Sequence, residues 1–185
     1  MSEVLKFLQQ RNSAAKLEAP GPGEAELREM IVAATRVPDH AWLRPWRFLT
    51  IAGERRRDFG EVLERCLLER DPAADEAARQ KARNAPLRAP LLLVVVARIS
   101  EHPKVPAVEQ RLSAGCAAQA ILLAAEAQGF AGIWRTGAPA FDRRVMAALG
   151  LAPNEEIVGF LYLGTRAGRA KPLPELPPDS YLNHW

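Results

Sequence analysis

The 185-residue chain has little cysteine, few aromatic residues and no long apolar run. Its two cysteines, Cys66 and Cys116, stand far apart and form no CxxC pair. This spacing argues against a disulfide framework or a zinc site and predicts two small buried side chains in a reducing compartment. The longest apolar run, residues 91–97, is too short to cross a bilayer, and the first residues lack the pattern of a signal peptide. We therefore expect a soluble cytoplasmic protein with no membrane partner and no bound metal.

The sequence also lacks the motifs GxGxxG, HExxH and GxSxG and the phosphate-binding P-loop. Their absence argues against the familiar dinucleotide, zinc and acyl-transfer sites. The 25 lysines and arginines only slightly outnumber the 22 acidic residues, which gives a net charge of +3 without any long basic run. A scattered positive charge suits a small anionic ligand, and it makes a nucleic-acid partner an unfavoured alternative.

Apolar periodicity predicts one α+β domain over residues 1–185, in which residues 166–185 form an extended, Pro-rich tail. The segment 90–97 is continuously apolar, so we expect a strand that is covered on both faces. The segment 108–128 is apolar on nearly all sides, which predicts a central helix. Its small residues would admit a neighbouring helix, for example from a second copy of the chain. The expected helices span 2–11, 24–36, 54–69, 75–84, 108–128 and 141–149, and the expected strands span 47–52, 90–97, 131–136 and 157–164.

Residues 36–48 form the most unusual loop of the sequence, with two prolines, two tryptophans, three arginines and His40 in thirteen positions. Aromatic rings and cations in one irregular segment favour a surface that holds a flat anionic ligand. A Pro-rich connector whose tryptophans fill the edge of a core explains the same composition. For His40 itself, a hydrogen-bonded loop residue is the commoner role, so both interpretations stay open at this point.

Two further segments could contribute to such a ligand site. Arg11-Asn12-Ser13 offers a guanidinium, an amide and a hydroxyl to a phosphate, although the same residues suit an ordinary helix end. Residues 128–137 combine glycines, which allow close backbone approach, with Trp134 and Arg135. A helix cap followed by a buried strand is the alternative there. Together, the three segments match the needs of a planar anionic cofactor such as FMN.

Several segments, taken in order, resemble the FMN-dependent nitroreductases. Arg11-Asn12-Ser13 resembles the Arg-x-Ser start of that family, and residues 36–40 with 45–48 resemble the helix-to-loop segment before its first core strand. The likeness is greatest to the short NAD(P)H nitroreductases of the YdjA type, and it covers nearly the whole chain before weakening after about Gly164. The match continues through residues 81–86, 113–117, 129–135 and 157–164.

The resemblance implies a nitroreductase-like α/β sandwich with a mainly antiparallel sheet flanked by helices. It also implies a homodimer with FMN at the subunit interface, so that each site combines residues of both chains. The nicotinamide of NADH or NADPH would lie near the end of the long helix. The implied cofactor-binding residues are Arg11, Asn12 and Ser13 at the phosphate and ribityl end, Trp134, Arg135 and Thr136 along the flavin, Arg36 and His40 from the partner chain, and Ala124, Ala125, Glu126, Ala127, Gln128 and Gly129 at the donor site.

The sequence departs from this family on both sides of Ser13. Short members often have a second arginine where this chain has Asn12, and an amide in place of that charge predicts weaker FMN binding. Larger members place a basic residue near the flavin pyrimidine, two positions after the serine. This chain has Ala15 there, followed by Lys16.

The resemblance implies an FMN-dependent NAD(P)H oxidoreductase that reduces a small electron-poor acceptor, such as a nitroaromatic or a quinone. Hydride would pass through flavin N5 in a ping-pong sequence, with no catalytic side chain, although His40 could donate a proton to the acceptor. The same scaffold also suits a reductive dehalogenase, an enone reductase or a flavin-degrading enzyme. A non-catalytic FMN-binding protein is the alternative from a different class.

Overall fold

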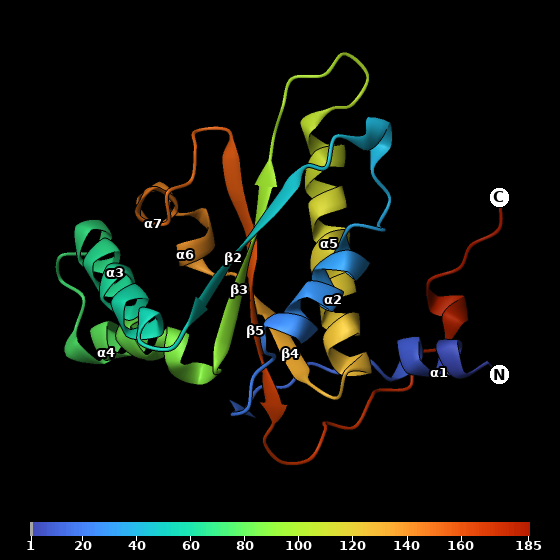
Figure 1. Cartoon of the computed structure of the whole chain (residues 1–185), viewed down its shortest axis with the longest axis horizontal. Coiled ribbons are helices and arrows are strands. Elements are labelled where there is room, and N and C mark those ends of the chain that lie inside the picture. Colours follow the sequence, from blue (N-terminus) through green and yellow to red (C-terminus); the bar gives the residue numbers. More distant parts are fainter. Residues whose placement is uncertain (1) are drawn as a thin grey trace.

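The computed structural model describes residues 2–185 and has a five-stranded sheet at its centre (Figure 1). Strands β2 (Trp46–Ala52), β3 (Leu91–Arg98) and β5 (Glu155–Arg166) are neighbours in that order. Strand β4 (Ala131–Arg135) pairs with the other side of β5, and the short β1 (Leu17–Glu18) pairs with the last residues of β5. Every pair is antiparallel, which confirms the antiparallel sheet implied by the resemblance.

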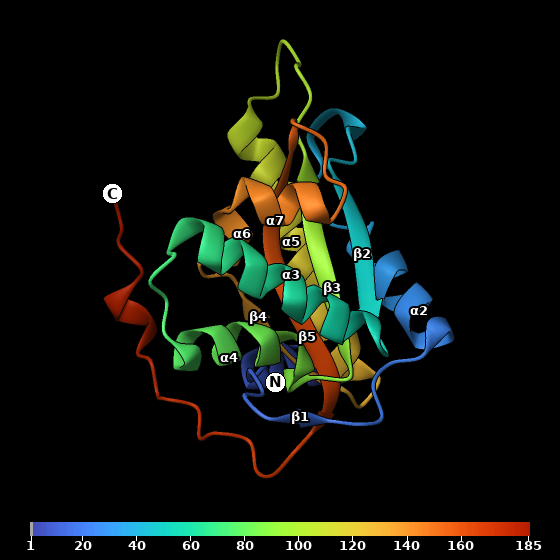
Figure 2. The same cartoon turned by 90° about the vertical axis from the view of Figure 1, so that its left-hand side faces the viewer.

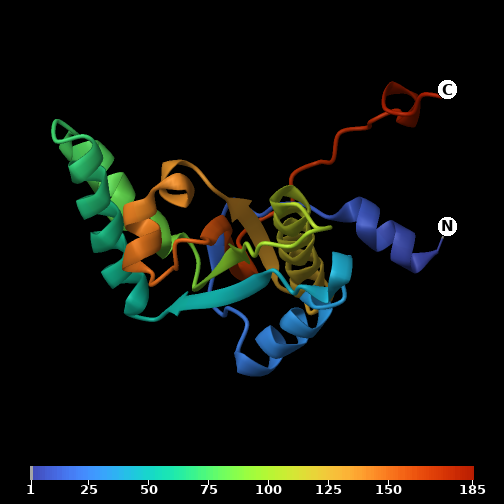
Figure 3. The ribbon, with the colours of Figure 1, turned by 90° about the horizontal axis from the view of Figure 1, so that it is seen from above.

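Helices cover both faces of the sheet, as the view from above shows (Figure 3). One face packs against α2 (Glu24–Ala34) and α5 (Ala107–Ala127). The other face packs against α3 (Arg55–Arg70), α6 (Ala138–Phe141) and α7 (Arg143–Ala148). This arrangement confirms the α+β sandwich. None of the helices formed by residues 2–185 is long and apolar enough to cross a membrane.

Strand β3 is buried on both faces, as its apolar sequence predicts. Residues 91–97 are each at most 6% exposed. Successive side chains point to opposite faces of a strand, so Leu93 and Val95 pack with α2 and α5, whereas Leu92 and Val94 pack with α3 and α7. Burial of one such side chain contributes roughly 1.5–3 kcal/mol. Strand β3 therefore joins the two halves of the core.

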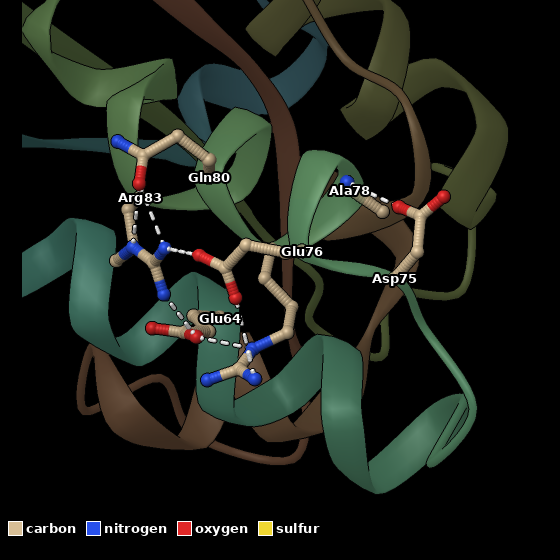
Figure 4. Close-up of polar contacts among 7 residues, drawn as sticks. Glu64, Asp75, Glu76, Ala78, Gln80 and Arg83 are labelled. Atoms are coloured by element: carbon tan, nitrogen blue, oxygen red, sulfur yellow. Dashed lines mark hydrogen bonds and ion pairs between the residues drawn. The ribbon is translucent and has the colours of Figure 1, made fainter.

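Helix α4 (Glu76–Asn84) is held against α3 by charged side chains (Figures 2 and 4). Arg79 donates a hydrogen bond of 2.8 Å to Glu64 of α3, and Arg83 donates to both Glu64 and Glu76. The hydrogen bond from Arg83, followed by that from Arg79, lowers the pKa of the Glu64 carboxyl. Both arginines of α4 therefore have carboxylate partners.

A nearly buried carboxylate joins β5 to β2. Arg47 donates two hydrogen bonds of 2.6 Å to Glu155, whose side chain is 8% exposed. The backbone N–H of Ala152 donates a third bond, at 3.0 Å. These bonds, with that from Arg47 as the largest effect, lower the pKa of Glu155 to about 2. Glu155 is therefore ionised at any pH well above that value.

Two predicted boundaries differ from the structure. The helix expected over 141–149 is divided into α6 and α7, because the Asp142 side chain accepts a hydrogen bond of 3.0 Å from the backbone N–H of Arg144 and so begins a new helix. Strand β5 extends to Arg166, and its last residues pair with β1, which the sequence did not predict. A two-residue strand is too short to produce an alternating pattern.

Helix α5 is covered on one side only. Ala114, Ala118 and Ile121 are fully buried against the core, whereas Leu112 and Cys116 are exposed on the opposite side. The expectation that both cysteines are buried is right for Cys66 and wrong for Cys116 in a single chain. The physical reason is that the helix is apolar all round, while the rest of the chain covers only the side that faces the sheet.

The two ends of the chain lie beside the body rather than within it. Helix α1 (Glu3–Gln10) begins at Ser2, whose hydroxyl accepts a hydrogen bond of 3.2 Å from the N–H of Leu5, and it has no buried residue. Residues 167–185 are regular only in a short 3-10 helix, Pro178–Ser180. Both ends lie on the same side of the body as α5 (Figures 1 and 3). Their exposed apolar side chains are Val4, Leu5 and Leu8 in α1 and Leu173, Leu176, Tyr181, Leu182 and Trp185 in the tail.

Candidate functional site

A cavity of about 630 Å³ lies between α3, α4, the end of β4 and the middle of β5. Its volume is within the range typical of sites for small molecules and cofactors. The apolar part of the lining is formed mainly by side chains of α3 and β5, and the charged part consists of four cations from different elements. Its polar and aromatic lining includes Arg70, Lys81, Arg88, Arg135, Thr136 and Tyr162.

Arg135 enters this cavity from the end of β4. Its guanidinium carbon lies 5.7 Å from the centre of the Tyr162 ring, close enough for a cation–π interaction. The Nε atom of Arg135 is buried and has no hydrogen-bond partner. An unpaired buried donor is costly, so a ligand that accepts a hydrogen bond here would be stabilised. Burial raises the pKa of Tyr162, which keeps this phenol neutral.

Trp134 lies on the opposite face of the sheet because side chains alternate along β4. Its indole Nε1 donates a hydrogen bond of 3.3 Å to the carbonyl of Val158. Gly159 is essential to this arrangement, since a Cβ at that position would overlap the indole ring. The structure therefore places Arg135 and Thr136 at the cavity and Trp134 on the α5 side.

The segment Arg11-Asn12-Ser13 follows α1 and runs beside β4, where the N–H of Ala14 donates to the carbonyl of Gly132 at 3.0 Å. Arg11 donates to the Ser13 hydroxyl at 3.3 Å. The Asn12 amide is occupied by the carbonyl of Lys171 in the tail, at 2.6 Å. Arg166, which the sequence analysis did not single out, donates to the carbonyl of Asn12 at 2.8 Å and adds a second guanidinium here.

The loop with Arg36 and His40 lies at the N-terminal half of α5. His40 Nδ1 lies 2.7 Å from Oε2 of Glu109, and Ser113 donates to the carbonyl of Pro38 at 2.9 Å. Arg36 lines a hollow of about 420 Å³ in this loop. Trp46 is buried at the start of β2, as expected of an anchor, whereas Trp42 is 77% exposed.

The backbone of this loop is strained. Ala41, Trp42 and Arg44 have φ values of 60°, 54° and 49°, in the left-handed region that residues other than glycine rarely adopt. A hydrogen bond of 2.8 Å from the N–H of Arg44 to the Asp39 carboxylate helps to hold this shape. Strain of this kind clusters at ligand-binding segments, and it favours the ligand-wall interpretation of the loop over a plain connector.

The segment from Ala124 to Gly129 forms the opposite end of α5. Ala125 is fully buried, so its side chain cannot contact a ligand, and Gln128 donates to the carbonyl of Glu26 in α2 at 3.3 Å. The Oε1 atom of Gln128 is buried without a partner. Glu109 and Gln128 are separated by roughly 28 Å along the helix. A single chain therefore does not bring His40 and this segment together.

No group of three or more His, Cys, Asp and Glu side chains suited to a metal ion occurs among residues 2–185. The cations Lys81 and Arg88 of the cavity were also absent from the predicted site residues. Lys81 belongs to α4 and Arg88 follows it in the 3-10 helix Ala85–Arg88. Lys81 lies in the segment 81–86 that resembles the family, but the sequence does not place Lys81 or Arg88 at a cavity, because the cavity is assembled from elements that are distant along the chain.

Comparisons with known proteins agree with this architecture. A sequence model of the Nitroreductase family matches residues 8–165. The chain is 45% identical over 184 residues to the Escherichia coli (strain K12) protein named "Putative NAD(P)H nitroreductase YdjA", with 99% of this chain and 100% of the relative covered. A nitroreductase-like protein from Bacillus cereus superposes with a TM-score of 0.84 at 19% identity, over 100% of this chain and 97% of the other.

A second solved structure is the FMN and NADPH-dependent nitroreductase NfnB from sphigopyxis sp. strain HMH. It superposes with a TM-score of 0.79 at 17% identity, over 100% of this chain and 99% of the other. At 17–19% identity, the two solved structures show only that the fold is shared. The family match and the relative that is 45% identical show that the chain is homologous to nitroreductases. The chain belongs to the nitroreductase family.

Proposed function

We propose that this protein is an FMN-dependent NAD(P)H oxidoreductase that reduces small electron-poor acceptors such as nitroaromatics or quinones. The observation that supports it most is the cavity at the end of β4, where the buried Nε of Arg135 lacks a hydrogen-bond partner. A flavin ring offers the flat surface and the acceptor atoms that such a site needs. The name of NfnB, an FMN and NADPH-dependent nitroreductase of the same fold, agrees with this cofactor assignment.

The residues present fit the two chemically different ends of FMN. Arg11 and Ser13 would bind the phosphate, with Arg166 contributing positive charge beside them. Asn12 would have a smaller part than its position in the motif implies, because its amide already binds the carbonyl of Lys171. Arg135 and Thr136 would border the ring at the cavity, and Trp134 would support β4 from the α5 side.

A homodimer would complete the site. Arg36 and His40 lie at one end of α5 and the donor segment at the other, so that two copies packed with their α5 helices antiparallel would bring the two ends together. The exposed apolar stripe of α5, with Val108, Leu112 and Cys116, offers the contact surface. Helix α1 and the tail lie on the same side with further exposed apolar side chains, and they would wrap the partner subunit.

Bound FMN supplies the chemistry, which is acceptance of hydride from NADH or NADPH and its delivery to the acceptor. The chain binds and orients the cofactor, supplies positive charge around it and excludes water from the apolar part of the cavity. His40 of the partner subunit would donate a hydrogen bond or a proton to the acceptor. The hydrogen bond between His40 and Glu109 would fix the orientation of the imidazole.

Anaerobic mixing of the purified protein with NADH or NADPH tests this proposal. Yellow protein with noncovalent FMN that loses its visible flavin absorption on mixing, and regains it with an acceptor, would support the reductase. Yellow protein whose colour persists would point to a non-catalytic FMN-binding protein. Reduction by NAD(P)H without turnover of nitroaromatics or quinones would point to another reductive activity on this scaffold, such as dehalogenation or enone reduction.

A further inference from the structure

We propose that the acceptor of this enzyme is an aromatic acid, meaning a flat apolar ring with a carboxylate, and that Lys81 and Arg88 bind the carboxylate. The inference rests on the proposed function and adds the class of substrate to it. It follows from the distribution of charge around the cavity of about 630 Å³, and from the chemistry of its remaining walls.

The charged residues around this cavity are all cations. Arg70, Lys81, Arg88 and Arg135 line it, and no Asp or Glu is found among its described lining residues. Arg70 is bound to Asp142 at 3.1 Å. Within residues 2–185, the other three cations have neither an ion pair nor a side-chain hydrogen bond. The cavity therefore has uncompensated positive charge.

Helix α4 and the segment after it contain both cations with carboxylate partners and cations without them. Arg79 and Arg83 face α3, and each has a carboxylate partner there (Figure 4). Lys81 and Arg88 border the cavity from the same part of the chain without such partners. Lys81 and Arg88 are both exposed and therefore hydrated, and an anion bound in the cavity would be the partner that the chain itself does not supply.

The rest of the cavity lining is largely apolar. Leu63 and Val145 come from α3 and α7, and Phe160 comes from β5, with each at most 6% exposed. Apolar walls exclude water and strengthen a charge interaction beside them. A ligand that fits both parts has an apolar body and an anionic group, and a benzoate-like molecule is the simplest such acceptor.

The FMN phosphate, which is another anion of the proposed reaction, fits Lys81 and Arg88 less well. The FMN phosphate has its own donors at Arg11 and Ser13, which do not line this cavity.

The test compares 4-nitrobenzoate with 4-nitrobenzamide, which has nearly the same shape and no charge. The reaction consumes one NADPH and one proton per nitro group and yields a nitroso group, NADP⁺ and water. For the FMN-loaded wild type we expect kcat/KM to favour the acid by about fivefold, since an ion pair with exposed cations contributes up to about 1 kcal/mol. The variant Lys81→Gln/Arg88→Gln should lose this preference, and Arg65→Gln, on α3 outside the cavity, should keep it.

Two further measurements separate the possible failures. Equal kcat/KM for acid and amide in the wild type would overturn the inference. The inference would also be overturned if the double variant keeps the preference for the acid but binds FMN more weakly, or is reduced more slowly by NADPH under anaerobic conditions. If neither NADH nor NADPH reduces the wild-type flavin, the proposed function is wrong. Calorimetry of 4-nitrobenzoate binding to the wild type and the double variant then tests the anion site by itself, and equal affinities would reject it.

Discussion

His40 Nδ1 lies 2.7 Å from the Glu109 carboxylate, and this contact ties the strained loop after α2 to the first turn of α5. The two side chains are 53% and 43% exposed, so the pair contributes little to folding stability. Its importance is positional, because it holds the imidazole beside the first turn of α5.

Replacement of His40 tests the contribution of the loop to the flavin site. We expect His40→Ala to weaken FMN binding by about fivefold, the effect of one lost hydrogen bond of about 1 kcal/mol, with little change in melting temperature. Fluorescence titration of the apoprotein with FMN measures this. The control is His102→Ala, which removes a histidine from a different loop. Unchanged FMN affinity and unchanged half-reactions in His40→Ala would remove His40 from the site.

Cys116 provides a test of the dimer. The midpoint of α5 falls beside residue 116, so two antiparallel copies of the helix would bring the two Cys116 thiols close to the twofold axis. Mild oxidation should then produce a disulfide-linked dimer of the wild type and of Cys66→Ser, but none of Cys116→Ser. Non-reducing electrophoresis is the measurement. A cross-linked dimer that persists in Cys116→Ser would contradict this packing.

Leu112 tests whether the dimer is required for cofactor binding. A charge on the exposed stripe of α5 would be buried by the partner subunit, which is costly. Leu112→Glu should therefore give a monomer with little bound FMN, as measured by light scattering and absorbance. Val32→Glu, at an apolar position on α2 with a similar exposure of 53%, should remain dimeric and yellow. A monomeric Leu112→Glu with full FMN content would show that one chain suffices.

The Arg47–Glu155 pair predicts how stability depends on pH. The pKa of Glu155 is lowered to about 2 in the folded state, so its contribution is complete above the unfolded value of roughly 4.3 and is lost as the pH falls from there toward 2. Because Arg47 is 28% exposed, solvent screening reduces the expected loss to about 2 kcal/mol. Urea denaturation between pH 7 and 3 measures it.

The variant Glu155→Gln should be destabilised at neutral pH and should depend less on pH in the acidic range. The neighbouring Glu156→Gln is a suitable control, because Glu156 and its partner Arg111 are 41% and 46% exposed. Such a surface pair contributes at most about 1 kcal/mol. Equal destabilisation by the two substitutions would contradict the distinction between the nearly buried pair and the exposed one.

Gly159 tests the support that Trp134 gives to β4. A Cβ at position 159 would overlap the indole, so Gly159→Ala should shift Trp134, change its fluorescence emission and weaken FMN binding. In Gly115→Ala the added Cβ would lie 3.8 Å from the same indole, an ordinary contact. This second variant should retain the emission spectrum. Identical emission and FMN affinity in Gly159→Ala and the wild type would show that the indole is not held at this position.

The sequence was most informative where one element has one uniform pattern. The apolar run of β3 predicted burial on both faces, and the structure agrees because the layers on either side are both present in one chain. Helix α5 has a similarly uniform pattern, yet one of its sides is exposed, since periodicity indicates that a surface needs cover and not which molecule provides it. The break at Asp142 was missed because a cap depends on one side chain and not on a period.

The candidate site was predicted only in part, because part of it depends on contacts between residues that are distant along the chain. Arg11, Arg135 and His40 stand out in motifs, whereas Lys81 and Arg88 become noticeable only when the partners of their neighbours Arg79 and Arg83 are known. Whether a cation has an ion-pair partner depends on the folded structure and is not visible in the neighbouring sequence. The family resemblance predicts the FMN cofactor, whereas the cavity is visible only in the structure.

The separation of the two half-sites along α5 has a genetic consequence. In an antiparallel pair, each flavin would take Arg11 and Arg135 from one subunit and His40 from the other. A chain with Arg11 replaced and a chain with His40 replaced would each form defective homodimers. Coexpressed, they would also form mixed dimers in which one site has both substitutions and the other has neither. Coexpression of two impaired chains would therefore restore one intact site in each mixed dimer.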